Sequence, residues 1–257
     1  MGQQSNAQKR ESIRQYREQR RQEAIAKQKK QDRMMWTIVI GAVALVVLLA
    51  CLPAIFSLFK GDPYEATDYV QMNVSYTDNV GEAKQGTIVL ELYGNLAPIT
   101  VKNFTKLTSE GFYNGLTFHR IIEGFMIQGG DPKGDGTGDS GERIKGEFNS
   151  NGVQNDLLHE RGVISMARGS YSMNSASCQF FIVHQTSPHL DGDYAAFGRV
   201  IDGMDTVDAI AVLETNSNDK PLNTVTITSM TVITKDQLPQ NAQEQNAMLP
   251  AQKERFI

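Results

Sequence analysis

The feature that most restricts how this chain can fold is a run of 26 consecutive uncharged residues, 34–59. As an α-helix rising about 1.5 Å per residue, such a run is roughly 39 Å long, against about 30 Å for the hydrocarbon core of a bilayer. Residues 38–49 are apolar on every face of a helix, which a buried core helix seldom needs. The sequence therefore predicts one transmembrane helix over 34–59, with Trp36 at the headgroup level.

Charge is divided unequally between the two sides of this run. Residues 1–33 contain ten Lys or Arg and four Asp or Glu, a local net charge of +6, whereas residues 60–257 contain 15 and 25, a local net charge of −10. The positive-inside rule then predicts a cytoplasmic N-terminus and an extracytoplasmic C-terminal part, in the cell membrane. The acidic C-terminal part argues against a nucleic-acid partner, because it would repel phosphates.

Other kinds of membrane anchor fit the sequence less well than a spanning helix. Residues 48–51 resemble a bacterial lipobox, so a lipoprotein anchored through Cys51 is the alternative, although the apolar residues 52–59 continue the span. A cleaved signal peptide fits poorly, because its apolar region is about 7 to 15 residues long. Myristoylation at Gly2 is excluded, since the motif needs Ser or Thr where this chain has Asn6.

Residues beyond the run are predicted to form one β-rich domain. Alternation of apolar and polar residues and short apolar runs predict strands over 70–76, 88–92, 117–122, 126–129, 163–167, 179–184, 196–200 and 225–233. Two helices are predicted, one from Pro98 to the residues before Gly111 and one over 204–213. Many short strands with two helices indicate a closed barrel. The predicted divisions are a basic arm 1–33, the span 34–59, a linker 60–69, the folded domain 70–235 and a mobile tail 236–257.

Residues 118–131 place one cation and one amide among large apolar side chains, with no acid–base pair or nucleophile. If this segment is extended, Arg120 and Gln128 share one face and His119 and Phe125 the other, with Gly124 free to break the register. Such a set of side chains suits holding and twisting a peptide rather than covalent chemistry.

The same segment, FHRIIEGFMIQGGD, resembles the signature of the cyclophilins, which are peptidyl-prolyl cis-trans isomerases. The segments 165–167, 177–182 and 190–192 follow in the family's order, and the resemblance covers roughly residues 71–235. It implies a mainly β fold, an eight-stranded antiparallel barrel capped by two α-helices, here preceded by the predicted transmembrane helix. It also implies isomerase activity on X-Pro bonds without cofactor or metal, and proline-containing polypeptides as partners of a monomer.

The resemblance also assigns roles to single residues. Arg120 would donate a hydrogen bond toward the proline nitrogen, and Gln128 and Gln179 would orient Arg120 or hold the peptide backbone. The main chain of Ala167 and Arg168 would pair with the peptide. The pocket for the proline ring is assigned to Phe125, Met126, Phe181 and Leu190.

Three positions depart from the commonest family pattern. Arg168 replaces a frequent Asn, which matters little if that residue acts through its main chain. His189 stands where some members have a Trp that contacts cyclosporin, so strong inhibition by that drug is not implied. Tyr194 replaces a pocket His; its ring can still pack and its hydroxyl can donate, so a changed substrate preference is expected.

Other candidate sites carry weaker signals. Residues 136–141 fit G-x-G-x-x-G, but no helix pattern follows, which argues against a nucleotide site. Asp131, Asp135 and Asp139 lack the spacing of an EF-hand loop and are interpreted as turn residues, and the four histidines lack metal-ligand spacing. The sequence thus favours an isomerase that assists folding of exported or cell-surface proteins. A membrane-tethered, non-catalytic proline-peptide binding module is the alternative.

Overall fold

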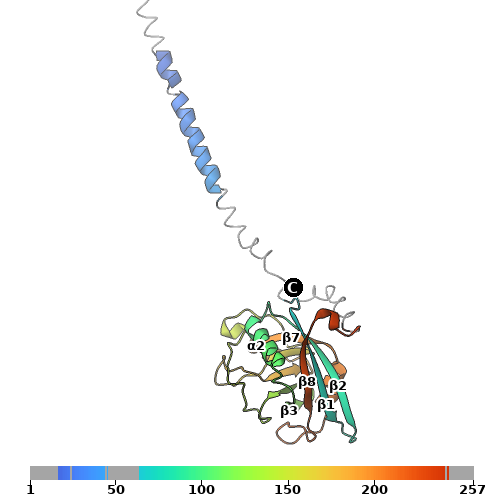
Figure 1. Cartoon of the computed structure of the whole chain (residues 1–257). Helices are drawn as coiled ribbons and strands as arrows, with labels where there is room; N and C mark the ends of the chain where they lie inside the picture. Colours follow the sequence, from blue (N-terminus) through green and yellow to red (C-terminus); the bar gives the residue numbers. More distant parts are fainter. Residues whose placement is uncertain (1–16, 24, 44, 46–63, 241, 243–257) are drawn as a thin grey trace, which may run out of the picture. The chain divides into compact units, whose positions relative to one another are not determined.

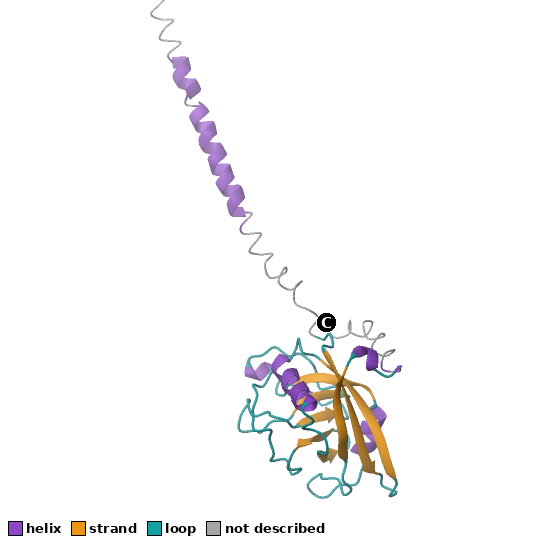
Figure 2. Cartoon of the chain, viewed as in Figure 1, coloured by secondary structure: helices purple, strands orange, loops and turns teal. Residues whose placement is uncertain are grey.

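The computed structural model describes residues 17–23, 25–43, 45, 64–240 and 242 (Figure 1). The chain divides into two units, 1–60 and 61–257. The described residues of the first unit are helical (Figure 2). These residues are exposed.

Only part of the predicted membrane span falls on described residues. Over the ranges that the structure describes, no helix combines the length and the apolarity that crossing a bilayer requires. Residues 44 and 46–59 of the predicted span, including Cys51, lie outside those ranges. So do residues 60–63 of the predicted linker and residues 241 and 243–257 of the predicted tail.

The second unit is built on a closed barrel of eight antiparallel strands. Around the barrel the order is β1-β2-β7-β5-β6-β4-β3-β8, and β8, β1 and β2 lie side by side (Figure 1). The strands are β1 Asp68–Thr77, β2 Ala83–Leu92, β3 Thr117–Ile122, β4 Met126–Asp131, β5 Val163–Met166, β6 Phe180–Val183, β7 Ala196–Asp202 and β8 Thr226–Ile233. This confirms the predicted eight-stranded barrel.

Alternation along the strands explains which residues enter the barrel. In β1, Val70, Met72 and Val74 are buried, while the residues between them are partly exposed. Val70 and Met72 pair with Leu90 and Ile88 of β2, so apolar side chains meet on the inner face. One face of β1 and of β2 therefore packs in the core, which sets the register between these strands.

Two α-helices cover this core, as predicted. α2, Pro98–Ser109, begins with Pro98 at its first position, and α3, Met204–Ala211, follows β7. Short 3₁₀ turns occur at η1 Asn149–Asn151, η2 Pro188–Leu190 and η3 Lys235–Gln237. The buried residues Phe104 of α2 and Val207 of α3 belong to the same core cluster as the inward strand residues.

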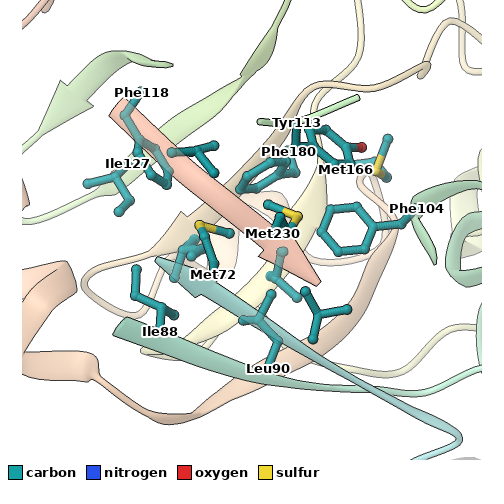
Figure 3. Close-up of a cluster of buried hydrophobic side chains, with 14 of the residues drawn as sticks. Met72, Ile88, Leu90, Phe104, Tyr113, Phe118, Ile127, Met166, Phe180 and Met230 are labelled. Atoms are coloured by element: carbon teal, nitrogen blue, oxygen red, sulfur yellow. The ribbon is translucent and has the colours of Figure 1, made fainter. Parts of the chain in front are cut away.

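Aromatic rings, among them Phe104, Tyr113 and Phe180, lie among methionine and aliphatic side chains in the core (Figure 3). The ring of Phe104 lies 5.2 Å from Tyr113, 5.5 Å from Phe180 and 5.1 Å from Phe197, centroid to centroid. Rings at these distances and tilted to one another stabilise the fold beyond the area that they bury. The barrel interior is thus filled by side chains, and the candidate site has to lie outside it.

Candidate active site

The hairpin of β3 and β4 places the residues of the FHRIIEGFMIQGGD segment. Arg120 and Gln128 pair across it, and Gly124 in the turn has a φ of +74°, which glycine adopts without strain. The N–H of Gly124 donates to Nδ1 of His184, and the carbonyl of Phe125 accepts the N–H of His184 at 2.9 Å. Phe125 therefore lies in a turn held by the residues after β6.

This turn corrects one expectation from the alternation pattern. In a continuous strand Phe125 would face away from Arg120, but both side chains line the same cavity. The chain reverses at Gly124, so the two-residue alternation does not run through the turn.

The cavity next to the hairpin has a volume of about 180 Å³. It is smaller than the clefts of about 300–1,000 Å³ that bind drug-sized ligands, so it suits one small ring. It is lined by Arg120, Phe125, Met126, Gln128, Ala167, Arg168, Phe181, Leu190 and Tyr194. Met126, Phe181 and Leu190 belong to an apolar cluster separate from the barrel core. The structure therefore brings together nine of the eleven residues predicted from the sequence.

The remaining two predicted residues lie beside this cavity. Gln179 lines a neighbouring cavity of about 390 Å³, which shares Gln128, Ala167 and Arg168 with the first. The exposed His189 does not line the cavity; its ring lies 5.3 Å from the ring of Phe125, centroid to centroid.

Arg120 projects from β3 with two-fifths of its side chain exposed. Its Nε donates to a carboxylate oxygen of Asp219 at 3.2 Å. Nη1 and Nη2 make no hydrogen bond to any residue that the structure describes. The guanidinium therefore has donors that no described residue uses, at a cavity that also contains large apolar side chains.

Gln128 bonds to Gln179 rather than to Arg120. Nε2 of Gln128 donates to Oε1 of Gln179 at 3.0 Å, and Nε2 of Gln179 donates to the carbonyls of Gly136 and Gly138. Within the described part of the chain, neither glutamine bonds to Arg120. In this structure the partner of Arg120 among the described residues is the carboxylate of Asp219, and the roles predicted for the two glutamines stay predictions.

His159 supports the back of the cavity. Its ring stacks on Phe181 at 6.0 Å and 16°, and it meets Tyr194 edge-on. Its Nδ1 lies 2.9 Å from Asp191 and its Nε2 3.0 Å from the hydroxyl of Ser165. Burial lowers the pKa of His159, and Asp191 only partly opposes that effect. A neutral imidazole that donates to Asp191 and accepts from Ser165 satisfies all three groups.

This trio of Ser165, His159 and Asp191 is not arranged for nucleophilic catalysis. Ser165 is fully buried, and its hydroxyl does not line either cavity. Cys178 is also buried, and burial raises the pKa of its thiol to about 11. In the ranges described, no group of three or more His, Cys, Asp or Glu side chains is placed to hold a metal ion. What the site offers is a cation, amides and an apolar pocket.

Comparison with known proteins places this chain in a family. A family model described as "Cyclophilin type peptidyl-prolyl cis-trans isomerase/CLD" matches residues 75–232. The chain belongs to the cyclophilin family of peptidyl-prolyl cis-trans isomerases.

Relatives and solved structures agree with this assignment. The cyclophilin domain is similar to a peptidyl-prolyl cis-trans isomerase-like 1 of Emericella nidulans, 40% identical over 158 residues that cover 61% of this chain and 95% of the relative. It is 48% identical over 126 residues to a peptidyl-prolyl cis-trans isomerase of Synechococcus elongatus, covering 49% and 81%. A Cryptosporidium parvum cyclophilin, crystallised in the presence of the dipeptide Ala-Pro, matches with a TM-score of 0.54 and 32% identity, covering 63% and 99%.

Arg168 of this cyclophilin uses its side chain as well as its main chain. Its guanidinium lies 4.7 Å from the ring of Tyr194 and 5.3 Å from that of Phe148, and its Nε donates to the carbonyl of Asp193. Such stacking of a cation on aromatic faces is favourable. Replacement of the family's frequent Asn therefore has a structural effect, because Arg168 holds the ring of Tyr194 at the cavity wall.

The main chain at Ala167 and Arg168 has groups left for a peptide. The Ala167 N–H donates to the carbonyl of Gln179 at 3.0 Å. No hydrogen bond among the described residues uses the Ala167 carbonyl or the Arg168 N–H. Ala167 and Arg168 line both cavities.

Two residues that support the site were missed by sequence reasoning. The sequence indicated only that His159 lacks metal-ligand spacing, and Asp219 was not singled out. Neither belongs to a short motif, and each meets its partner only through the tertiary fold: Asp219 is 99 residues from Arg120 in the chain. By contrast, the carboxylate of Asp131 accepts the N–H groups of Lys133 and Asp135, which confirms its interpretation as a turn residue.

Proposed function

We propose that this isomerase twists X-Pro bonds by electrostatic and steric means at Arg120 and the adjoining pocket. The barrier to rotation, about 18–20 kcal/mol, comes from conjugation of the amide nitrogen's lone pair with the carbonyl. A guanidinium that donates toward the proline nitrogen localises this lone pair and favours the twisted amide. Phe125, Met126, Phe181 and Leu190 grip the proline ring, while the main chain at Ala167 and Arg168 holds the flanking peptide.

The observation that carries the proposal is the position of Arg120. Its side chain lines the same small cavity as the four apolar residues, and its terminal nitrogens bond to no described residue. An effect of about 7 kcal/mol on the barrier corresponds to roughly 10⁵-fold acceleration. That total would be shared between the hydrogen bond to the nitrogen and binding that selects the twisted state. The Cryptosporidium relative crystallised with Ala-Pro supports proline-containing peptides as ligands.

Exchange spectroscopy by NMR on a short Ala-Pro peptide tests this function with the full-length chain. Uncatalysed exchange takes tens to hundreds of seconds, and addition of the enzyme should bring it into the range of the experiment. The rate should be unchanged by a chelator, because no step requires a metal. If the peptide binds but its exchange stays at the uncatalysed rate, the chain acts as a proline-peptide binding module.

We further propose that the isomerase domain is tethered to the cell membrane, outside the cytoplasm, and acts on exported or cell-surface proteins. The support is the uncharged run 34–59 together with the +6 charge of residues 1–33. A lipid on Cys51 would be the other way to tether it. A tether would keep the isomerase near proteins that are folding after export.

A further inference from the structure

Arg120 has one ionic partner among the described residues, and it comes from a distant loop. Nε of Arg120 donates to Oδ2 of Asp219 at 3.2 Å, and 40% and 42% of the two side chains are exposed. An ion pair of this exposure contributes little to stability. Its main effect is on where the guanidinium lies.

Hydrogen bonds within the loop that carries Asp219 fix its backbone. The N–H of Asn216 donates to the carbonyl of Lys220 at 2.9 Å, and the N–H of Asp219 donates to the carbonyl of Asn216 at 3.0 Å. The side-chain oxygen of Asn216 accepts the N–H groups of Asn218 and Lys220. Thr215 and Pro221 form a bridge at the base of the loop. Residues 216–220 therefore present Asp219 from a defined backbone rather than from a loose connection.

Asp219 has a backbone conformation that few side chains adopt. Its φ is +61°, the only positive value among the described residues other than glycine. Aspartate tolerates this region better than most residues, although glycine adopts it more easily. The carbonyl of Asp219 accepts the N–H of Ile121 at 2.8 Å, directly beside Arg120. Asp219 thus contacts two consecutive residues of β3, one through its backbone and one through its side chain.

We infer that Asp219 is a positioning residue for Arg120: its carboxylate holds the Nε edge of the guanidinium so that Nη1 and Nη2 are left for the peptide. A guanidinium is planar and carries its donors in a rigid fork, so fixing one edge orients the others. Gln128, which pairs with Arg120 across the hairpin, gives its amide to Gln179 instead. The inference rests on the proposed role of Arg120.

Replacement of Asp219 by glycine in the full-length chain separates this role from a structural one. Glycine accepts the positive φ and keeps the carbonyl that binds Ile121, so Asp219→Gly removes only the carboxylate. Loss of orientation should lower kcat about ten-fold, since small misplacements of a catalytic group are costly. KM should change less than two-fold and the melting temperature little.

Three further variants separate an effect on Arg120 from a general effect of charge. Glu214→Gln removes one negative charge from an exposed side chain of the same segment and should keep the parent rate. Asp219→Asn, which still tolerates the positive φ and offers an oxygen to Nε, should recover part of the lost turnover. In an Arg120→Ala background, Asp219→Gly should have no further effect on kcat, because Asp219 acts through Arg120.

Three results would overturn the inference. A parental or higher kcat for Asp219→Gly would show that the carboxylate does not position Arg120. An undiminished effect of Asp219→Gly in the Arg120→Ala background would show that it acts elsewhere. If Arg120→Ala alone turned over like the parent, the proposed role of Arg120 would fail and this inference with it, a result distinct from failure of the Asp219 variant only.

Discussion

Arg120 and the apolar pocket are adjacent but contribute different interactions. The guanidinium can interact with the proline nitrogen, whose hydrogen-bonding capacity rises as the amide twists. The rings and aliphatic chains of the pocket contact proline in either state. At the scale of single residues, turnover and binding should therefore respond to different substitutions.

Arg120→Ala should reduce turnover by about one to two decades. Hydrogen bonds from charged groups typically contribute about 1.5 to 3 kcal/mol, and about 1.36 kcal/mol corresponds to one decade. Affinity for an Ala-Pro peptide should fall less, because the pocket remains. NMR exchange rates and peptide titrations measure the two quantities, with Lys106→Ala on α2 as a charge-matched control.

Phe181→Leu tests the pocket, as Arg120→Ala tests the guanidinium. It removes part of the surface proposed to contact the proline ring while keeping a buried apolar side chain. It should weaken affinity as well as rate. A folded Arg120→Ala variant with parental turnover would mean that another group acts on the proline nitrogen.

His159 should make the stability of the fold depend on pH. Its folded pKa is lowered below 6.5, chiefly by burial, so between 6.5 and that lower value the unfolded chain binds the proton more readily. The free energy of unfolding is therefore fully retained above about pH 6.5 and decreases as pH falls through this interval. Two neighbouring groups also act on the pKa of His159: Asp191 raises it, whereas His189 lowers it.

Urea unfolding at pH 7.5 and pH 5 should show this dependence. His159→Gln removes the titrating group, so the loss of unfolding free energy between the two pH values should be smaller in the variant than in the parent. His119, whose pKa is also lowered mainly by burial, is present in both proteins and should leave a residual loss. Equal losses in parent and variant would contradict the assignment to His159.

At the scale of elements, the β3–β4 hairpin positions most of the site. Arg120 ends up opposite Gln128, and Phe125 and Met126 follow the turn at Gly124. The loop 216–220 then meets β3 at Ile121, and the segment after β6 meets the turn at Phe125. The pocket therefore depends on a tight reversal held from both sides.

Gly124→Ala should destabilise the fold by about 1 kcal/mol, because alanine is strained at a positive φ. It should also weaken peptide binding, since Phe125 and Met126 come directly after the turn. Gly81→Ala in the β1–β2 turn is the matched control: φ is +86° and an added Cβ meets nothing within 4 Å. Denaturant unfolding should give similar losses for both variants, whereas only Gly124→Ala should change the peptide affinity. A loss of affinity in both would point to a global effect.

At the scale of the whole molecule, the sequence separates a basic arm from an acidic isomerase domain. The net charges are +6 for residues 1–33 and −10 for residues 60–257. Charge bias of this kind sets the orientation of a membrane segment, since Lys and Arg are retained on the cytoplasmic side.

Protease added to intact cells should therefore release the isomerase domain while a tag near residue 3 stays protected. Immunoblots against tags at the two ends measure this. The reverse pattern of protection would show an inverted orientation, and a lipidated Cys51 at the mature N-terminus, found by mass spectrometry, would show a lipid anchor instead of a helix.

The elements of the barrel were predictable because their signals are local. Alternation in 70–76 and 225–233, Pro98 at a helix start and the FHRIIEGFMIQGGD segment each depend on neighbours in sequence, and each lies close to its predicted place. Nine of the predicted site residues line one cavity, and they could be named in advance because they lie on short segments that resemble a family signature.

What only the tertiary structure decided is how those segments support one another. The turn at Gly124 moved Phe125 to the side of Arg120, the loop 216–220 supplied the carboxylate for Arg120, and His159 was placed behind Phe181. No spacing in the chain encodes these contacts, because a side chain's distant partner is set by barrel closure and strand register. The sequence by itself determined the family, the barrel and the pocket residues, whereas closure of the barrel determined which groups hold Arg120 and the pocket in place.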